Sequence, residues 1–175
     1  MSKLFNILFL GILIAKDTVD AGLCDLKIDP AILQKIHLQV YKGDSSSFTF
    51  TESHVTNPEI IAQDIVHGDE TILYVHGFME DTSADNVMVI PKAYLDKGGV
   101  NVIVVDWGEI ALNINYLYVS SQVPYIGKAI AESMEKLADV IDLNTLHVIG
   151  HSLGAHIASH ISKFMNVTLN RLTGT

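Results

Sequence analysis

The most informative stretch of the chain is residues 146–164, which read LHVIGHSLGAHIASHISKF. Leu146–Ile149 is a short apolar run that predicts a strand, and the residues from Ser152 to about Phe164 predict a helix. Between them lies GHSLG at 150–154, which matches the pattern G-x-S-x-G. In that pattern a strand turns sharply into a helix and holds a serine at the apex in a strained backbone conformation. The stretch therefore predicts a nucleophilic serine at Ser152.

The neighbours of Ser152 have their own expected roles. Gly150 and Gly154 are required because side chains there would strike the neighbouring strand and helix. The helix N-terminus directs unpaired N–H groups and the positive end of the helix dipole towards the reaction, so the N–H of Leu153 can donate to a developing oxyanion. His151 is expected to shape this turn without transferring protons. A serine in an ordinary glycine turn is the alternative, but the strand before the turn and the helix after it argue against that.

Further apolar runs on either side of this stretch indicate the fold class. Runs typical of strands and helices alternate along the later part of the chain, which predicts a mostly parallel sheet with helices on both faces. In such α/β folds the active site lies at the carboxyl ends of the strands. The expected strands are Ile36–Tyr41, Phe48–Val55, Thr71–Val75, Val100–Val105, Leu146–Ile149 and Val167–Leu172, and the expected helices are about Asp85–Leu95, a long helix whose apolar face carries Val123, Ile126, Ile130, Leu137 and Ile141, and the helix after Ser152.

A second motif follows the strand that ends at Val75. The chain continues with His76-Gly77-Phe78, and in α/β-hydrolases a second oxyanion donor comes from the loop after an early strand, often with an HG sequence. Gly77 permits close approach of the backbone, and the N–H of Phe78 is the candidate donor. An ordinary strand-to-loop turn is the alternative. Two motifs at the carboxyl ends of two parallel strands favour one common site.

These motifs belong to a larger resemblance that covers nearly all of the chain after its first residues. The segments LYVHGF at 73–78, VVDW at 104–107, GHSLGAH at 150–156 and RLTG at 171–174 occur in the order and approximate spacing of the pancreatic-lipase-like family of animal neutral lipases, which includes venom phospholipases A1. The resemblance implies an α/β-hydrolase that cleaves carboxylic esters of lipids, as a triacylglycerol lipase or a phospholipase A1, at a lipid–water interface. It also implies Ser152 as nucleophile, Phe78 and Leu153 as oxyanion donors, and no metal or organic cofactor.

The other two members of a catalytic triad are not found after Ser152. In this fold the triad runs Ser, then Asp or Glu, then His, yet residues 153–175 contain no Asp or Glu. The histidines there, His156 and His160, lie on the nucleophile helix, where the geometry for a base is poor. The family pattern continues from Arg-x-Thr-Gly into Leu-Asp-Pro-Ala, whose Asp is the triad acid. The resemblance thus implies that both partners lie beyond Thr175, that the fold is incomplete at its C-terminus, and that the chain is inactive alone.

The first residues predict secretion. Lys3 precedes an apolar run at Leu4–Ala15, which is shorter than the roughly 20 residues that span a bilayer. Small residues follow, including Ala21, so we expect a signal peptide at 1–21, a mature hydrolase domain at 22–175 in the extracellular space, and no transmembrane segment. A buried N-terminal strand or helix is the alternative. The chain has a single cysteine, Cys24, which cannot form an internal disulfide. It can form an intermolecular disulfide, stay a free thiol, or pair with a cysteine that is missing from this chain.

Composition and the remaining motifs exclude other classes of function. A net charge of −9 without basic runs argues against a nucleic-acid partner. His156 and His160 are spaced like zinc ligands, but no third ligand or HExxH motif accompanies them, so no metal is expected. Asp106 precedes Ser152, the wrong order for a triad acid, and a structural role is expected. Asn166-Val167-Thr168 is an N-glycosylation sequon if the helix ends before it.

Two rival functions stay open on the sequence. One is a secreted lipid-binding or yolk-like homologue that keeps the fold without turnover, against which the intact Ser152 and its glycines argue. The other is an unrelated flavodoxin-like protein, which would need a phosphate-binding loop after an early strand, and none is visible.

Overall fold

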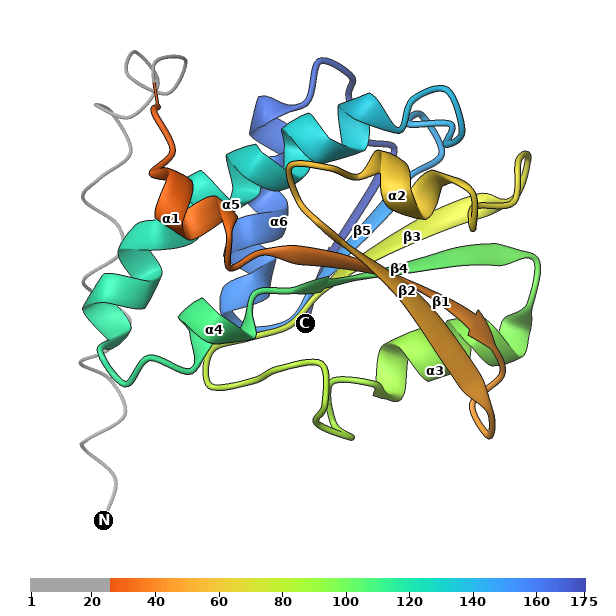
Figure 1. Ribbon diagram of the computed structural model, residues 1–175, viewed down its shortest axis with the longest axis horizontal. Helices are drawn as coiled ribbons and strands as arrows, with labels where there is room; N and C mark the ends of the chain where they lie inside the picture. Colours follow the sequence, from red (N-terminus) through yellow and green to blue (C-terminus); the bar gives the residue numbers. More distant parts are fainter. Residues whose placement is uncertain (1–25) are drawn as a thin grey trace.

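The computed structural model describes residues 26–175, which fold around one six-stranded sheet in the order β2-β1-β4-β3-β5-β6 (Figure 1). The signal-peptide prediction for residues 1–21 and the question of Cys24 lie outside the described residues. The strands are β1 (His37–Gly43), β2 (Phe48–His54), β3 (Glu70–Val75), β4 (Val100–Asp106), β5 (His147–Gly150) and β6 (Arg171–Gly174). The helices are α1 (Pro30–Leu33), α2 (Glu59–Ala62), α3 (Val89–Lys97), α4 (Gly108–Ala111), α5 (Tyr116–Lys136) and α6 (Leu153–Phe164).

The sheet is mixed, and its parallel part carries both sequence motifs. Strands β4, β3, β5 and β6 are parallel to one another, while β1 is antiparallel to both β2 and β4. The antiparallel part arises because a short Asp44–Ser47 turn returns the chain directly from β1 to β2. The carboxyl ends of β3 and β5 lie side by side, since Val75 is in register with Gly150. The mostly parallel sheet with helices that was expected from the sequence is confirmed.

Helices cover both faces of the sheet, as predicted, because the central strands are apolar on both sides. Along β3, Leu73 and Val75 point into the larger core, which also contains the buried faces of α5 and α6. Ile72 and Tyr74 point into the smaller core, to which Leu95 of α3 contributes. Figure 1 shows α3 on one side of the sheet and α5 with α6 on the other.

Three predicted element boundaries were wrong. The last strand begins at Arg171 rather than Val167, and it is mostly exposed rather than buried. The apolar residues Val167 and Leu169 instead pack from a loop against the larger core, and this takes them out of the sheet. Helix α3 begins at Val89 rather than near Asp85. Helix α5 ends at Lys136, so the buried Leu137 and Ile141 lie beyond it in turns. No helix within residues 26–175 is both long and apolar enough to cross a membrane.

Candidate active site

The nucleophile elbow, residues Gly150–Gly154, joins β5 to α6 with a strained turn at its apex. Ser152 is exposed, and its backbone has φ 51° and ψ −119°. Residues other than glycine rarely adopt a positive φ. Such strain costs about 1–3 kcal/mol and persists only where the surroundings impose it. Here His151 N–H donates to the Val75 carbonyl at 2.9 Å on β3, and Ser152 N–H donates to the Thr175 carbonyl at 2.8 Å after β6. The elbow is thus pinned between two neighbouring strands.

Two glycines make this elbow sterically accessible. A Cβ atom on Gly150 would lie 2.4 Å from the Gly154 carbonyl oxygen, and one on Gly154 would lie 2.3 Å from the Val75 carbonyl oxygen. Both obstacles are main-chain atoms, which cannot rotate aside as a side chain can. Helix α6 can therefore begin against the end of β3 only because both positions lack a side chain. This close approach brings the elbow to the loop that follows β3.

That loop, residues His76–Asp81, passes directly against the serine. A Cβ on Gly77 would lie 3.1 Å from Ser152 Cβ, closer than carbon atoms normally approach. Phe78 N–H, in this loop, and Leu153 N–H, at the first position of α6, have no hydrogen-bond acceptor among the described residues. The first turn of a helix leaves such N–H groups unpaired. The structure therefore places both predicted oxyanion donors near Ser152, Phe78 in the loop that passes against it and Leu153 in the first turn of α6.

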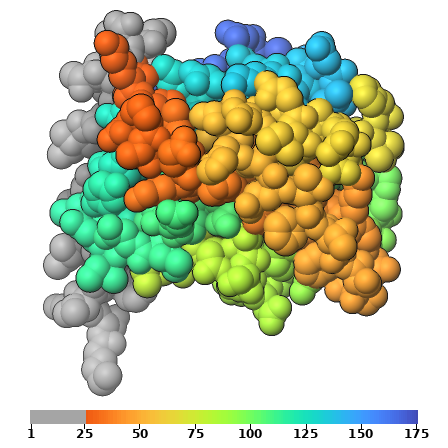
Figure 2. Space-filling model, viewed as in Figure 1, coloured from red at the N-terminus to blue at the C-terminus, as the bar shows by residue number. Residues whose placement is uncertain are grey.

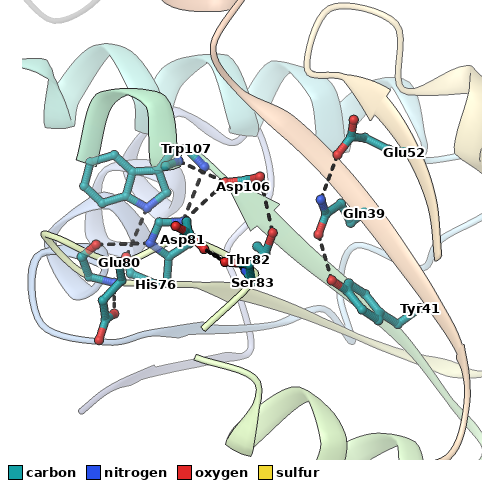
Figure 3. Close-up of polar contacts among 12 residues, drawn as sticks. Gln39, Tyr41, Glu52, His76, Glu80, Asp81, Thr82, Ser83, Asp106 and Trp107 are labelled. Carbon is teal, nitrogen blue, oxygen red and sulfur yellow. Dashed lines mark hydrogen bonds and ion pairs between the residues drawn. The ribbon is translucent and has the colours of Figure 1, made fainter. Parts of the chain in front are cut away.

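A buried aromatic pair lies beneath this loop (Figure 3). The imidazole of His76 is fully buried and stacks on Trp107, with ring centroids 5.3 Å apart and planes inclined by 16°. Its Nδ1 lies 3.1 Å from the Gly77 carbonyl oxygen, which can only accept, so Nδ1 carries the proton. Its Nε2 accepts the Trp107 N–H at 3.4 Å, and the Trp107 indole N–H donates to the His76 carbonyl at 3.1 Å. The HGF and DW segments thus interlock below the predicted site.

Asp106 belongs to this buried layer and makes no hydrogen bond to Ser152. Its Oδ1 lies 3.7 Å from Nε2 of His76 and accepts the Gly108 N–H at 2.9 Å. Burial acts to raise the pKa of Asp106, but the hydrogen bonds that its carboxylate accepts, including those from the Gly108 N–H and the Thr82 hydroxyl, help to hold the pKa below its ordinary value. The carboxylate is therefore ionised and fastens the turn after β4. These contacts agree with the structural role expected from its place before the serine.

Sequence reasoning missed Glu80, which lies in the His76–Asp81 loop. Its Oε2 accepts the Gly77 N–H at 2.7 Å and lies 3.1 Å from Nδ1 of His151, while its Oε1 accepts the Asn86 amide at 2.9 Å. His151 comes immediately before Ser152, so this carboxylate connects the loop after β3 with the elbow. Nothing in the local sequence distinguishes Glu80 from the acids that follow it. The HGF motif indicated that the loop after β3 is important, but it gave no sign of the role of Glu80.

The other polar residues singled out in the sequence lie away from Ser152. His156 is exposed on α6, and His160 stacks on Phe164 with 6.3 Å between ring centroids. Burial lowers the pKa of His160, helped by the positive charge of Lys163. Within residues 26–175, no three His, Cys, Asp or Glu side chains are grouped closely enough to hold a metal ion. Asn166 is exposed in the bend after α6, and its N–H donates to Glu135 at 2.6 Å.

Comparison with known proteins agrees with this geometry. The family model described as Lipase matches residues 18–175. The chain belongs to the lipase family. Among curated relatives of this lipase-family chain, a phospholipase A1 of Vespa crabro is 36% identical over 102 residues, which cover 53% of this chain and 34% of the relative. Pancreatic triacylglycerol lipase of Sus scrofa is 31% identical over 69% of this chain and 27% of the relative.

A third relative extends the comparison to vertebrate lipases of another type. Lipase member H-A of Xenopus laevis is 30% identical over 60% of this chain and 23% of the relative. The chain thus spans about a quarter to a third of the length of the curated relatives it matches.

Proposed function

We propose that this lipase-family chain supplies the nucleophile and the oxyanion hole of a secreted carboxylic ester hydrolase that acts on lipid esters, either triacylglycerol or phospholipid. The observation that carries the proposal is the exposed, strained Ser152 at the N-terminus of α6, with the unpaired N–H of Leu153 in the first turn of that helix and the unpaired N–H of Phe78 in the adjacent loop. The family membership, and the similarity to a phospholipase A1 and a triacylglycerol lipase, support the same reaction class.

In the proposed reaction, Oγ of Ser152 attacks the ester carbonyl carbon and gives its proton to a general base. The carbonyl oxygen becomes an oxyanion, which accepts hydrogen bonds from the N–H groups of Phe78 and Leu153. The positive end of the α6 dipole adds to this stabilisation. Collapse of this tetrahedral intermediate breaks the ester C–O bond, and the base returns the proton to the leaving alcohol. Water, activated by the same base, then hydrolyses the acyl-enzyme to release the fatty acid and free Ser152, and no metal or organic cofactor is required.

Ser152 also needs a base and an acid that orients the base. Among the described residues, no side chain hydrogen-bonds its hydroxyl. The N–H and C=O of Thr175, the residue after β6, bond to Gly150 and Ser152 of the elbow at 3.0 and 2.8 Å, so the carboxyl end of β6 lies beside the proposed nucleophile.

An exposed apolar segment beside the site supports action at a lipid–water interface. The rings of Phe78 and Tyr116 meet edge-on with 5.1 Å between their centroids, and Met79 N–H donates to the Ala111 carbonyl at 3.0 Å. The segment Ala111–Leu117, which runs from the end of α4 into α5, therefore borders the His76–Asp81 loop. In this segment Ile114 is 88% exposed and Leu117 is 79% exposed. Figure 2 shows the segment, in green to teal, at the surface of this face. Clustered exposed apolar side chains mark surfaces that contact lipid or protein.

The proposed location is extracellular. Two observations support this location. In residues 1–21 a basic residue precedes a short apolar run, as in a signal peptide. Asn166 of the glycosylation sequon is exposed and lies outside helices and strands. Secretory oligosaccharide transfer requires an accessible asparagine, and a bend after a helix meets that requirement.

The test is serine-directed labelling of the secreted gene product. We expect a fluorophosphonate probe to label the wild type, and Ser152→Ala to abolish both labelling and hydrolysis of tributyrin and of phosphatidylcholine vesicles. Ser159→Ala, which removes another exposed serine of the same helix, is the matched control and should behave as wild type. Equal hydrolysis by Ser152→Ala would refute the proposal. Binding of vesicles without any labelling would favour the lipid-binding alternative.

A further inference from the structure

One carboxylate bridges two loops, residues His76–Asp81 and the turn of the elbow at His151–Ser152, which adjoin the proposed oxyanion donors. We propose that Glu80 is a positioning residue that sets the separation and direction of the Phe78 and Leu153 N–H groups. The inference rests on the proposed function, because the two N–H groups matter only if an oxyanion forms between them. It concerns a residue that neither the sequence motifs nor the catalytic steps above include.

The contacts of Glu80 place it between the two loops. Its Oε2 accepts the N–H of Gly77, the residue directly before Phe78, at 2.7 Å. The same oxygen lies 3.1 Å from Nδ1 of His151, the residue directly before Ser152, and an ionised carboxylate only accepts, so His151 donates. The carboxylate side chain is only 14% exposed, so water competes weakly for these bonds. Asn86 holds the other oxygen at 2.9 Å and fixes the rotation of the carboxylate.

The backbone at Gly77 explains why such a bridge is needed. A glycine is required there because a Cβ would lie 3.1 Å from Ser152 Cβ, yet glycine has the widest backbone freedom of any residue. Its two polar groups are both held by side chains: Glu80 accepts the N–H, and His76 donates to the C=O at 3.1 Å. That C=O shares one planar peptide unit with the Phe78 N–H. Glu80 on the N–H side and His76 on the C=O side together fix the backbone dihedral angles of Gly77, and these angles set the direction in which the Phe78 N–H points.

A strained residue turns Glu80 back towards Gly77. Met79 has φ 59°, which is unusual for a side chain of its size, and its N–H is held by the Ala111 carbonyl at 3.0 Å. Such a conformation persists only where several contacts impose it. The neighbouring acids do not share this role. Asp81 accepts the Ser83 N–H at 2.8 Å, and Asp85 is fully exposed, with Lys92 at 3.7 Å. The bridge is therefore specific to Glu80.

The kinetic test compares three variants of the secreted gene product on a soluble p-nitrophenyl ester. The concentration of reactive Ser152 in each preparation is measured by titration with the phosphonate, and kcat is calculated per reactive site, so that misfolded protein does not lower it. We expect Glu80→Ala to lower kcat by about 10- to 100-fold with little change in KM, because misplaced donors weaken only transition-state binding. Glu80→Gln keeps an acceptor oxygen and should lose less. Asp85→Asn removes the same charge from the segment between the His76–Asp81 loop and α3, and it should match the wild type.

A second measurement does not depend on activity. We expect amide hydrogen exchange at Gly77, followed by NMR, to become at least tenfold faster in Glu80→Ala and to be unchanged in Asp85→Asn. A wild-type protein without Ser152-dependent hydrolysis would count against the proposed function. In that case the exchange rate of the Gly77 amide alone would show whether Glu80 holds the loop. If the wild type is active, either of two results would overturn the positioning role. One is a kcat per titrated site in Glu80→Ala that lies within twofold of the wild-type value, and the other is an unchanged exchange rate of the Gly77 amide. A purely structural role would lower the titrated fraction and leave kcat per site intact.

Discussion

Substituting Gly154 by alanine tests the steric account of the nucleophile elbow. The added Cβ would lie 2.3 Å from the Val75 carbonyl oxygen and 2.4 Å from that of His76, whereas ordinary contact begins near 3.4 Å. Both obstacles belong to the backbone at the end of β3. Helix α6 must therefore move away from β3 by about 1 Å, as the difference between these contacts requires.

The expected loss of stability follows from that displacement. Overpacking of a well-packed interior costs about 1–3 kcal/mol. The same movement stretches the hydrogen bond from His151 N–H to the Val75 carbonyl, now 2.9 Å, and a lost bond adds about 1 kcal/mol. We therefore expect Gly154→Ala to lower the free energy of unfolding by about 2–4 kcal/mol, which corresponds to a fall in Tm of roughly 5–15 °C for a domain of this size.

The assay is urea unfolding followed by the fluorescence of Trp107, the single tryptophan of the chain, which is fully buried. Gly68→Ala is the control, because Gly68 has φ 89° but no atom within 4 Å of an added Cβ. It should cost only the backbone strain of about 1–2 kcal/mol. The displacement should also slow phosphonate labelling of Ser152 by about 100-fold, since a shift of 1 Å at a reacting centre has that effect. A Gly154→Ala protein within 0.5 kcal/mol of wild type that labels at the normal rate would refute the steric reasoning.

Three further predictions concern pH and processing. Burial, aided by the charge of Arg171, lowers the pKa of His147 below its ordinary 6.5, so the unfolded chain binds a proton that the folded chain does not; stability should fall as pH drops below 6.5, and urea midpoints between pH 7 and 5 should show a slope that His147→Gln reduces. Burial raises the pKa values of Tyr41 and Tyr74 to about 12, so stability should be intact below pH 10 and fall between pH 10 and 12; absorbance titration at 295 nm should show two late-ionising tyrosines, and ionisation of all tyrosines near pH 10 in the folded protein would contradict this. The secreted product should begin near Gly22 and carry a glycan on Asn166 that Asn166→Gln removes; intracellular protein that retains Met1 would argue against secretion.

The sequence by itself was sufficient for the fold class and for the two motifs at the strand ends. Alternating apolar runs and the glycine pattern around Ser152 are local signals, because strand, turn and helix preferences act over a few neighbouring residues. They located β3, β4, β5 and α6 to within a few residues. They placed β6 too early, because an apolar run does not say whether Val167 and Leu169 pack in a sheet or against the core from a loop.

Only the tertiary structure decided what surrounds the predicted site. The contact between Glu80 and His151 joins residues 71 positions apart, and His76 meets Trp107 across 31 positions. No local pattern encodes such pairs, since they form only when β3, β4 and β5 lie side by side and their ends converge. The antiparallel placement of β1 beside β4 is likewise a property of the assembled sheet. The motifs indicated which backbone N–H groups are the candidate oxyanion donors, and long-range packing determined which side chains contact their loops.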